Sequence, residues 1–160
     1  LALEALDAAC AAAQQDRQRE GEQLCAFFHE HLDLMEEALA HLGPEAERQP
    51  LLARERLDKR LASMPDLQAD PARLAQEVAL FADRCDITEE LSRLGAHCQQ
   101  MRQLLQREDA VGREMDFLAQ EMNREANTIC SKSASLAVTR LGLQLKGEAD
   151  KIREQLQNVE

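Results

Sequence analysis

Residues 87–105 read ITEELSRLGAHCQQMRQLL and are the stretch that best indicates the fold. Their apolar residues recur at alternating spacings of four and three, which is the seam expected where long helices pack nearly antiparallel. The members of the seam are Ile87, Leu91, Leu94, Cys98, Met101 and Leu105. We therefore predict an all-α protein in which long amphipathic antiparallel helices form an elongated bundle that resembles a coiled coil.

A second apolar stripe precedes this seam and ends before Gly43 and Pro44, which predict the end of the first helix. Its members are Leu24, Phe28, His31, Met35, Ala38 and Leu42. The polar residues 45–50 then predict a connection, and the apolar residues within 52–64 predict a short helix. Residues 1–70 are thus expected to form a helical linker or hairpin region.

A second region, residues 71–160, is predicted to be a C-terminal helical domain. Asp70 is a natural N-cap and Pro71 fits the first helical position, so a helix is expected to begin there. Nothing in residues 72–106 predicts an interruption, and Gly112 marks the next break. Further stripes follow along Met115, Leu118, Met122, Ala126 and Ile129, and along Leu141, Leu145, Ile152, Leu156 and Val159.

Residues 131–135 lose the apolar rhythm without containing Gly or Pro. They therefore form either a loop or a polar helical turn, and the pattern does not choose between the two.

Composition excludes several classes of protein. The 160 residues are 44% hydrophobic, which is enough for a core, and the net charge of −11 argues against a surface that binds nucleic acid throughout. No apolar run approaches the roughly 20 residues that a membrane-spanning helix needs. We expect a cytoplasmic protein with no membrane partner.

The five cysteines are odd in number and lack the spacing of a metal finger or a redox pair. Cys85 and Cys98 replace apolar residues on the helix stripes. We therefore interpret Cys10, Cys25, Cys85, Cys98 and Cys130 as reduced core thiols in a reducing compartment.

Polar residues gather on one flank beside the opening seam. At 100° per residue, this flank carries Asp86, Glu90, Arg93 and His97, which can bind a divalent metal, orient a phosphate and exchange protons. Glu90 and His97 lie roughly 10 Å apart along the helix axis, so a metal site needs a second helix or a second subunit. The alternative is a set of surface ion pairs worth roughly 0.2–0.5 kcal/mol each, and the pattern alone favours it.

The helix after Gly112 has two polar flanks. One carries Glu121, Glu125 and Thr128, and the other carries Asp116, Gln120, Asn123 and Asn127. Two Asn one turn apart are poor for helix stability, so we expect them either to bond a neighbouring helix or to contact a substrate. Ser131, Lys132 and Ser133 suit a phosphate group.

Several motifs follow one another in a fixed order from Arg84 onward. They are Arg84-Cys-Asp-Ile-Thr-Glu-Glu-Leu-Ser-Arg-Leu, His97, Val111-Gly-Arg, Asp116-Phe-Leu, Gln120-Glu-Met-Asn-Arg-Glu, Asn127-Thr-Ile and Ser131-Lys-Ser. This series resembles the C-terminal region of the YicC-type bacterial endoribonucleases. Arg19-Glu-Gly and the final Gln157-Asn-Val-Glu also resemble that family.

The resemblance implies metal-dependent cleavage of RNA phosphodiester bonds by a homo-oligomer whose subunits enclose the substrate. RNA is the expected partner, and no DNA is expected. Members of the family are longer and begin with a mixed α/β portion that this chain lacks. We therefore expect the chain to be a fragment with little or no activity alone.

Roles within these motifs are a chemical hypothesis. Carboxylates suit Mn²⁺ or Mg²⁺, so the candidate metal ligands are Asp86, Glu90, Asp116, Glu121 and Glu125. An unperturbed histidine side chain titrates near neutrality, so His97 is the candidate proton-transfer group. The candidate catalytic residues are His97, Glu90 and Glu121. The candidate RNA-binding residues are Arg84, Arg93, Arg113, Asn123, Arg124, Asn127, Ser131, Lys132 and Ser133.

Two other readings belong to different classes of protein. In one, the chain is a helical oligomerisation module, or a module that binds RNA or a partner, without catalysis of its own. In the other it is a coiled-coil scaffold, which the heptads support but which leaves the clustered Asn123, Asn127 and Ser131-Lys-Ser without a purpose.

Overall fold

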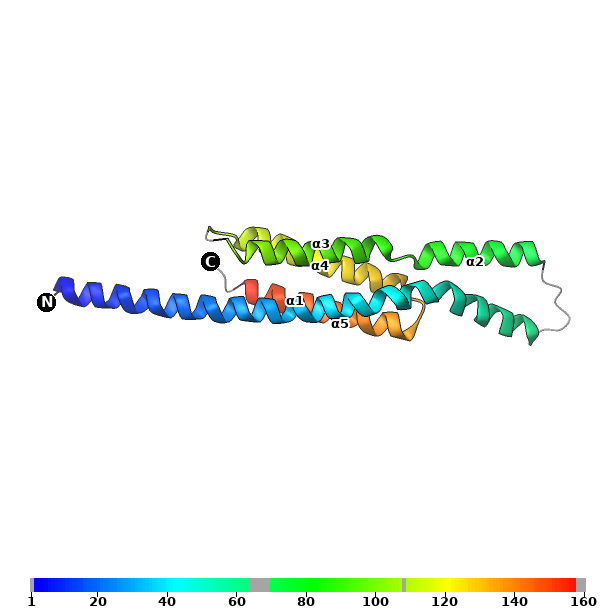
Figure 1. Cartoon of the computed structure of the whole chain (residues 1–160), viewed down its shortest axis with the longest axis horizontal. Helices are drawn as coiled ribbons and strands as arrows, with labels where there is room; N and C mark the ends of the chain where they lie inside the picture. Colours follow the sequence, from blue (N-terminus) through cyan, green and yellow to red (C-terminus); the bar gives the residue numbers. More distant parts are fainter. Residues whose placement is uncertain (1, 64–69, 108, 158–160) are drawn as a thin grey trace.

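The computed structural model describes residues 2–63, 70–107 and 109–157, which form five helices and no strand. The helices α1 and α4 run in one direction, and α2, α3 and α5 run in the other (Figure 1). Four of them, α1, α3, α4 and α5, pack together as an antiparallel bundle. The predicted all-α bundle is confirmed. The helices are α1 (Ala2–Ala62), α2 (Pro71–Cys85), α3 (Thr88–Leu104), α4 (Gly112–Lys132) and α5 (Leu136–Leu156).

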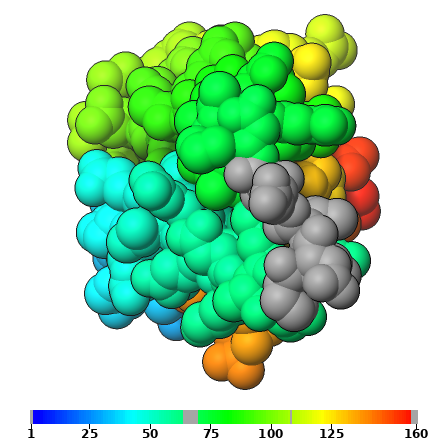
Figure 2. Space-filling view, turned by 90° about the vertical axis from the view of Figure 1, so that its right-hand side faces the viewer, coloured from blue at the N-terminus to red at the C-terminus, as the bar shows by residue number. Residues whose placement is uncertain are grey.

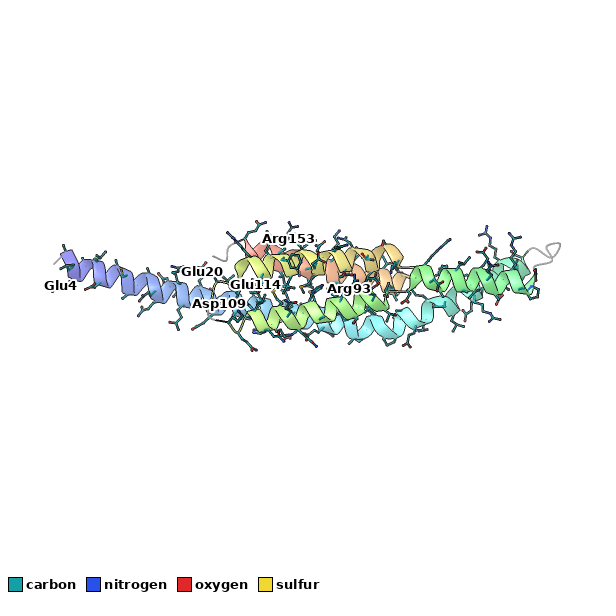
Figure 3. The ribbon with its side chains drawn as sticks, turned by 90° about the horizontal axis from the view of Figure 1, so that it is seen from above. Glu4, Glu20, Arg93, Asp109, Glu114 and Arg153 are labelled. Atoms are coloured by element: carbon teal, nitrogen blue, oxygen red, sulfur yellow. The ribbon has the colours of Figure 1, made fainter. Side chains whose placement is uncertain are left out.

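The bundle has an extension at each end. The last part of α1 continues beyond the bundle with α2 against it, and the first part of α1 projects alone at the opposite end (Figure 1). Residues 2–23 are exposed throughout, and Figure 3 places Glu4 and Glu20 on this projecting segment. None of the helices in the described part of the chain is long and apolar enough to span a membrane.

The core is built mainly from the stripes that the spacing predicts. Four predicted members are only partly buried, namely Leu24, Leu91, Leu105 and Leu141, and five core residues were not predicted, namely Leu32, Leu104, Ala119, Val138 and Ala149. Every member of the α4 stripe is at most 2% exposed, and α4 lies against both α3 and α5. Burying one large aliphatic side chain contributes about 1.5–3 kcal/mol, so these stripes provide most of the force that holds the helices together. The largest fully buried side chains of the core include Leu32, Met35, Leu42, Ile87, Leu94, Met101, Met122, Ile129, Leu145 and Ile152.

Charged pairs join α1 to its neighbours at the edge of this core. The buried His31 ring lies 2.5 Å from a carboxylate oxygen of Glu148 on α5, and Lys151 donates to the same carboxylate at 3.0 Å. Although burial acts in the opposite direction, the hydrogen bonds from Lys151 and His31 hold the pKa of Glu148 below its ordinary value. On the other side, Arg102 of α3 binds both carboxylate oxygens of Glu36 at 3.0 Å.

The predicted end of the first helix at Gly43 and Pro44 is wrong, as is the connection at 45–50. The helix α1 continues through both Pro44 and Pro50 and bends in this part (Figure 1). A proline inside a helix removes one main-chain hydrogen bond and kinks the helix. Here tertiary contacts outweigh that cost, because Leu42 and Gln49 on either side are fully buried.

Gln49 is a buried brace that joins three parts of the fold. Its side-chain amide donates to the carbonyl oxygen of Cys85 at 3.1 Å, and its carbonyl oxygen accepts from the main-chain nitrogen of Ala134 at 2.7 Å. Cys85 ends α2, and Ala134 lies between α4 and α5. One side chain of α1 thus sets the positions of both junctions.

The uninterrupted helix expected over residues 72–106 is also wrong. The chain is extended at Asp86, whose side chain accepts from the main-chain nitrogen of Thr88 at 2.9 Å and so caps the start of α3. Hydrogen bonds from Thr88 also hold the pKa of Asp86 below its ordinary value. The sequence carries a sign of this break, because an acid three residues before Glu89 resembles a capping box.

The start of α2 agrees with the prediction, since the Asp70 side chain accepts from the nitrogen of Ala72 at 2.9 Å and Pro71 is the first helical residue. The sequence left open whether residues 131–135 form a loop or a helical turn. In the structure α4 ends at Lys132 and α5 begins at Leu136, so a short non-helical junction lies between them. Ser133 is extended, and the Ser135 hydroxyl caps α5 by accepting from the nitrogen of Val138 at 3.2 Å. The predictions for Met64, for residues 65–69 and for 158–160 lie outside the described residues.

The cysteines are free, but only some of them lie in the core. Cys85 and Cys98 are buried as predicted, and burial raises the pKa of the Cys98 thiol to about 12. Cys10 is exposed, which contradicts its assignment to the core, because it belongs to residues 2–23 of α1, which are exposed throughout. Cys25 and Cys130 are half-buried.

We predict that Gln49→Leu lowers the free energy of unfolding by about 2–4 kcal/mol, because each main-chain group left buried without a partner costs about 1–3 kcal/mol. Urea denaturation measures the change. The control is Gln15→Leu on the projecting part of α1, where the side chain is exposed. Equal stability of the two variants would contradict the role of Gln49 as a brace.

We also predict that the contribution of Glu148 to stability is lost in acid. Because its pKa is lowered in the folded state, this contribution is complete above the ordinary value of 4.5 and disappears as the pH falls through the folded-state pKa. Glu148→Gln should cost about 1.5–3 kcal/mol at neutral pH and flatten the fall in melting temperature below pH 4.5. The exposed Glu154→Gln on the same helix is the control. An unchanged acid profile in Glu148→Gln would contradict the assignment.

A candidate metal and phosphate site between α3 and α4

The position of the α4 stripe decides where its two polar flanks point. With Met122, Ala126 and Ile129 buried in the bundle, the flank of Glu121 and Glu125 meets α3, and the opposite flank meets α5. A side chain on α3 can therefore form a site with Glu121 and Glu125, but not with the opposite flank of α4.

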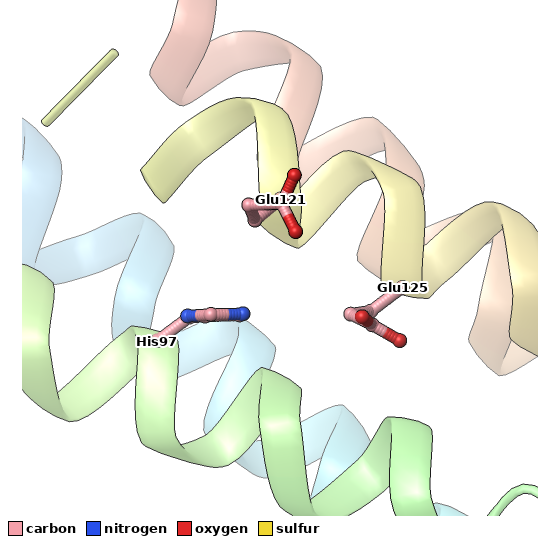
Figure 4. A group of neighbouring side chains, drawn as sticks. All are labelled: His97, Glu121 and Glu125. Atoms are coloured by element: carbon pink, nitrogen blue, oxygen red, sulfur yellow. The ribbon is translucent and has the colours of Figure 1, made fainter. Parts of the chain in front are cut away.

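His97 is the α3 side chain that meets the acidic flank. One ligand atom each from His97, Glu121 and Glu125 lies within 4.8 Å of the other two (Figure 4). Glu121 and Glu125 are one turn apart on α4 and share a face, while His97 approaches them from α3. Glu125 is only 5% exposed. We call these three residues the acid–imidazole cluster.

The sequence predicts that a metal site needs ligands from a second helix or a second subunit. In the cluster, α3 and α4 both contribute ligand atoms. The cluster contains two of the five predicted metal ligands. Glu121 and Glu125 are brought together, whereas Asp86, Glu90 and Asp116 are not among the groups that converge. His97, predicted as a proton-transfer group, is the third member of the cluster.

Glu90 is instead the partner of Lys132. The Lys132 ammonium, at the end of α4, lies 2.8 Å from one oxygen of the buried Glu90 and donates to the carbonyl oxygen of Asp86 at 2.9 Å. The second oxygen of Glu90 is buried with no hydrogen-bond partner among the described residues. A buried carboxylate held by one lysine is stable only while that partner is present.

Arg93 lies beside the cluster, on the flank of α3 that was predicted. Its guanidinium bonds the carboxylate of Glu89 one turn earlier and lies 3.6 Å from a carboxylate oxygen of Glu125. The Arg93 side chain is still 55% exposed. An arginine that touches an acid of the cluster and also faces solvent is suited to hold a phosphate beside it.

The other flank of α4 forms a polar surface against α5. Asn123 donates to Asp150 of α5, and Asn127 donates to the side chain of Asn123 at 2.7 Å. The interpretation that the two Asn bond a neighbouring helix is therefore confirmed for Asn123. An open groove of about 560 Å³ lies here, lined by Asn123, Asn127, Arg124, Arg153 and neighbours.

The remaining predicted residues are not members of the cluster, although Arg124 lies beside one of its acids. Asp116 accepts from Gln120 at 2.7 Å, and Arg113 is exposed at the start of α4. Arg124 is exposed, 3.6 Å from Glu121. Arg84 is exposed at the end of α2, and the hydroxyls of Ser131 and Ser133 bond main-chain oxygens of Thr128 and Ser135 at 2.8 and 2.9 Å.

Two elements of the site escaped the sequence analysis. The bond between Lys132 and Glu90 joins residues 42 positions apart, and no local spacing indicates it. Gln49 supports the same junction by bonding Ala134, but it lies in a polar stretch that looked like a connection. The prolines beside it were the misleading signal.

Taken together, the fold and the cluster define a helical protein whose candidate site lies between two antiparallel helices. A family model described as "Endoribonuclease YicC-like, C-terminal" matches residues 42–160. The chain belongs to this family of YicC-like endoribonucleases, as the motifs from Arg84 to Ser133 suggested.

Two curated relatives are similar along most of the chain. A protein of Clostridioides difficile (strain 630) named "Probable endoribonuclease YicC" is 38% identical over 159 residues, which are 98% of this chain and 54% of the relative. A protein of Haemophilus influenzae (strain ATCC 51907 / DSM 11121 / KW20 / Rd) with the same name is 38% identical over 144 residues, 90% of this chain and 50% of the relative. The chain thus spans about half the length of these relatives.

We predict that Lys132→Met lowers the free energy of unfolding by about 3–5 kcal/mol, because it leaves the charge of Glu90 buried and unpaired. The double variant Lys132→Met with Glu90→Leu should recover most of that loss. Chemical denaturation measures both. If the double variant is no more stable than Lys132→Met, the cost does not come from the isolated carboxylate.

Proposed function

We propose that the chain is the C-terminal helical part of an endoribonuclease that cleaves RNA phosphodiester bonds, that it acts as a homo-oligomer, and that the acid–imidazole cluster binds a divalent metal ion, Mn²⁺ or Mg²⁺. Membership of the YicC-like family supports the reaction class. The observation that carries the proposed site is the convergence of His97, Glu121 and Glu125 from two helices.

The cluster fits a metal ion in both chemistry and size. Two ligands at about 2.1 Å from one ion can be at most about 4.2 Å apart, so atoms within 4.8 Å of one another need only small side-chain rotations. Carboxylates suit Mn²⁺ and Mg²⁺, and the imidazole favours the transition metal. A bound divalent ion would supply Lewis-acid polarisation of phosphate oxygens.

The protein groups around the cluster have separate tasks in this proposal. Arg93 pairs with a phosphate oxygen, since its guanidinium faces solvent beside Glu125. Lys132 pairs with the carboxylate of Glu90 and so fixes the end of α4 against α3, which acts on the position of the site. The carboxylates attract the metal, and Arg93 offsets the repulsion between these acids and the RNA backbone.

We predict that Glu125→Gln and His97→Ala each lower the rate of RNA cleavage by the full-length protein at least about 100-fold, as expected for loss of an essential ligand or proton-transfer group. A gel assay with labelled RNA measures the rate, and circular dichroism verifies folding. Glu114→Gln, an exposed acid on the same helix, is the control. Wild-type rates in both cluster variants would remove this site from the reaction.

The same variants test metal binding without reference to activity. A ligand that binds only the folded state at 100 times its Kd stabilises it by about 2.7 kcal/mol, so Mn²⁺ should raise the melting temperature of the wild-type protein. Glu125→Gln should respond less, and excess chelator should reverse the shift and stop cleavage. Cleavage that continues unchanged in chelator would exclude the metal.

The second candidate function is a helical module that oligomerises or binds RNA or a partner without cutting. The observation that favours it is that Arg93 and Lys132 already form ion pairs within the chain, as a purely structural flank would. Under this reading, Glu125→Gln changes stability and leaves RNA cleavage by the full-length protein unaffected. Size-exclusion chromatography with light scattering tests the homo-oligomer that the proposed endoribonuclease requires.

A further inference from the structure

A second groove lies away from the cluster, where the last part of α1 packs against α2. It has a volume of about 440 Å³, with Arg56 and Arg60 of α1 on one side and Arg84 of α2 on the other. Figure 2 looks onto this end of the molecule, with α2 above the last part of α1. Leu57, Val78 and the half-buried Phe81 give the groove an apolar floor.

Among the residues that the structure describes, the arginines of this groove have no acidic partner, whereas several other arginines of the chain form ion pairs. Arg102 and Arg107 each bond two carboxylates. By contrast, neither Arg60 nor Arg84 forms an ion pair with any acid that the structure describes, and Arg56 donates to a main-chain carbonyl instead. The lining also includes one acid, Glu77 of α2, so the groove carries three guanidinium groups and a single carboxylate. In a chain of net charge −11, this local excess of positive charge indicates a site for an anion.

The net charge of α1 changes from negative in its first part to positive in its last part, where the groove lies. Residues 2–47 contain eleven Asp and Glu and two Arg, whereas residues 48–62 contain five Arg and Lys and two Asp and Glu. The positive end is the end that forms the groove. A polyanion that approaches the molecule is therefore drawn to this end and repelled from the other.

Contacts connect the groove with the candidate site. Arg56 bonds the carbonyl oxygen of Ala134 at 3.1 Å, two residues after Lys132. Lys132 in turn bonds the carbonyl oxygen of Asp86, two residues after Arg84. Because α2 and α3 follow one another along the same line, Arg84 is on the order of 20 Å from His97, at 1.5 Å per residue.

We infer that this groove binds a segment of single-stranded RNA that lies a few nucleotides from the acid–imidazole cluster. The inference rests on the proposed function, because it takes RNA as the substrate. Arg56, Arg60 and Arg84 bind the phosphates, and the ring of Phe81 contacts a base. An unpaired strand fits better than a duplex, because only unstacked bases can reach an apolar floor.

The test compares RNA binding by the full chain and by a double variant, Arg60→Gln with Arg84→Gln. Binding of a fluorescein-labelled single-stranded RNA is followed by anisotropy in chelator, with the RNA checked on a gel. The control is Arg19→Gln with Arg140→Gln, which changes the net charge equally at exposed positions outside the groove. Circular dichroism verifies the fold of each variant.

We expect the groove variant to bind about 10-fold more weakly than the control. The slope of log affinity against log salt should also become shallower by about 1.4, since each phosphate contact on a single strand contributes about 0.7. An affinity and slope equal to those of the control would overturn the inference. Equal loss of binding to poly-glutamate and to RNA would also overturn it, by indicating a site for an acidic protein segment.

Failure of this inference can be told from failure of the proposed function. If the groove variant binds RNA normally while Glu125→Gln abolishes cleavage by the full-length protein, the groove is not an RNA site and the proposed function stands. If the groove variant loses binding while Glu125→Gln still cleaves at the wild-type rate, the groove is an RNA site and the cluster is not the site of cleavage.

Discussion

Burial of the apolar stripe of α4 is the constraint on which the rest of the structure depends. The stripe occupies the middle of the bundle, and its residues are almost completely removed from solvent. Its hydrophobic free energy is gained only if α3 and α5 lie on either side of it, with α1 closing the bundle. This arrangement sends the two polar flanks of α4 toward different neighbours, so each flank acquires a separate environment.

This arrangement removes several polar side chains at the edge of the core from water. Glu90, Glu125, Glu148 and Gln49 are buried or nearly so, and each must have partners to be tolerated. Glu148 has His31 and Lys151, and Gln49 satisfies two main-chain groups. Glu90 and Glu125 are less well satisfied, since one oxygen of Glu90 has no partner among the described residues and Glu125 has an arginine only at 3.6 Å. Of these two acids, Glu125 belongs to the acid–imidazole cluster, and Glu90 lies on the same helix as His97, two turns earlier.

The two ends of the molecule are specialised in different ways. One end is the acidic, fully exposed start of α1, and the other is a hairpin of α1 and α2 with an arginine-lined groove. The projecting segment of α1, residues 2–23, is exposed throughout. The relatives are about twice as long as this chain, and a whole family member contains further residues beside these five helices. Division of the chain at residue 70 stays a prediction.

Much of the fold is contained in local sequence, because helical periodicity depends only on residues three and four apart. The stripes along α1, α3, α4 and α5, the cap at Asp70 and the two flanks of α4 all follow from it. The path of α1 through Pro44 and Pro50 does not, because distant contacts of Leu42 and Gln49 outweigh the local cost of proline. Likewise, the periodicity of α3 and α4 names His97, Glu121 and Glu125 as candidates, but their convergence depends on the relative axial shift of the two helices. That shift is decided by how the apolar side chains of α3, α4 and α5 interlock, and only the tertiary structure contains this information.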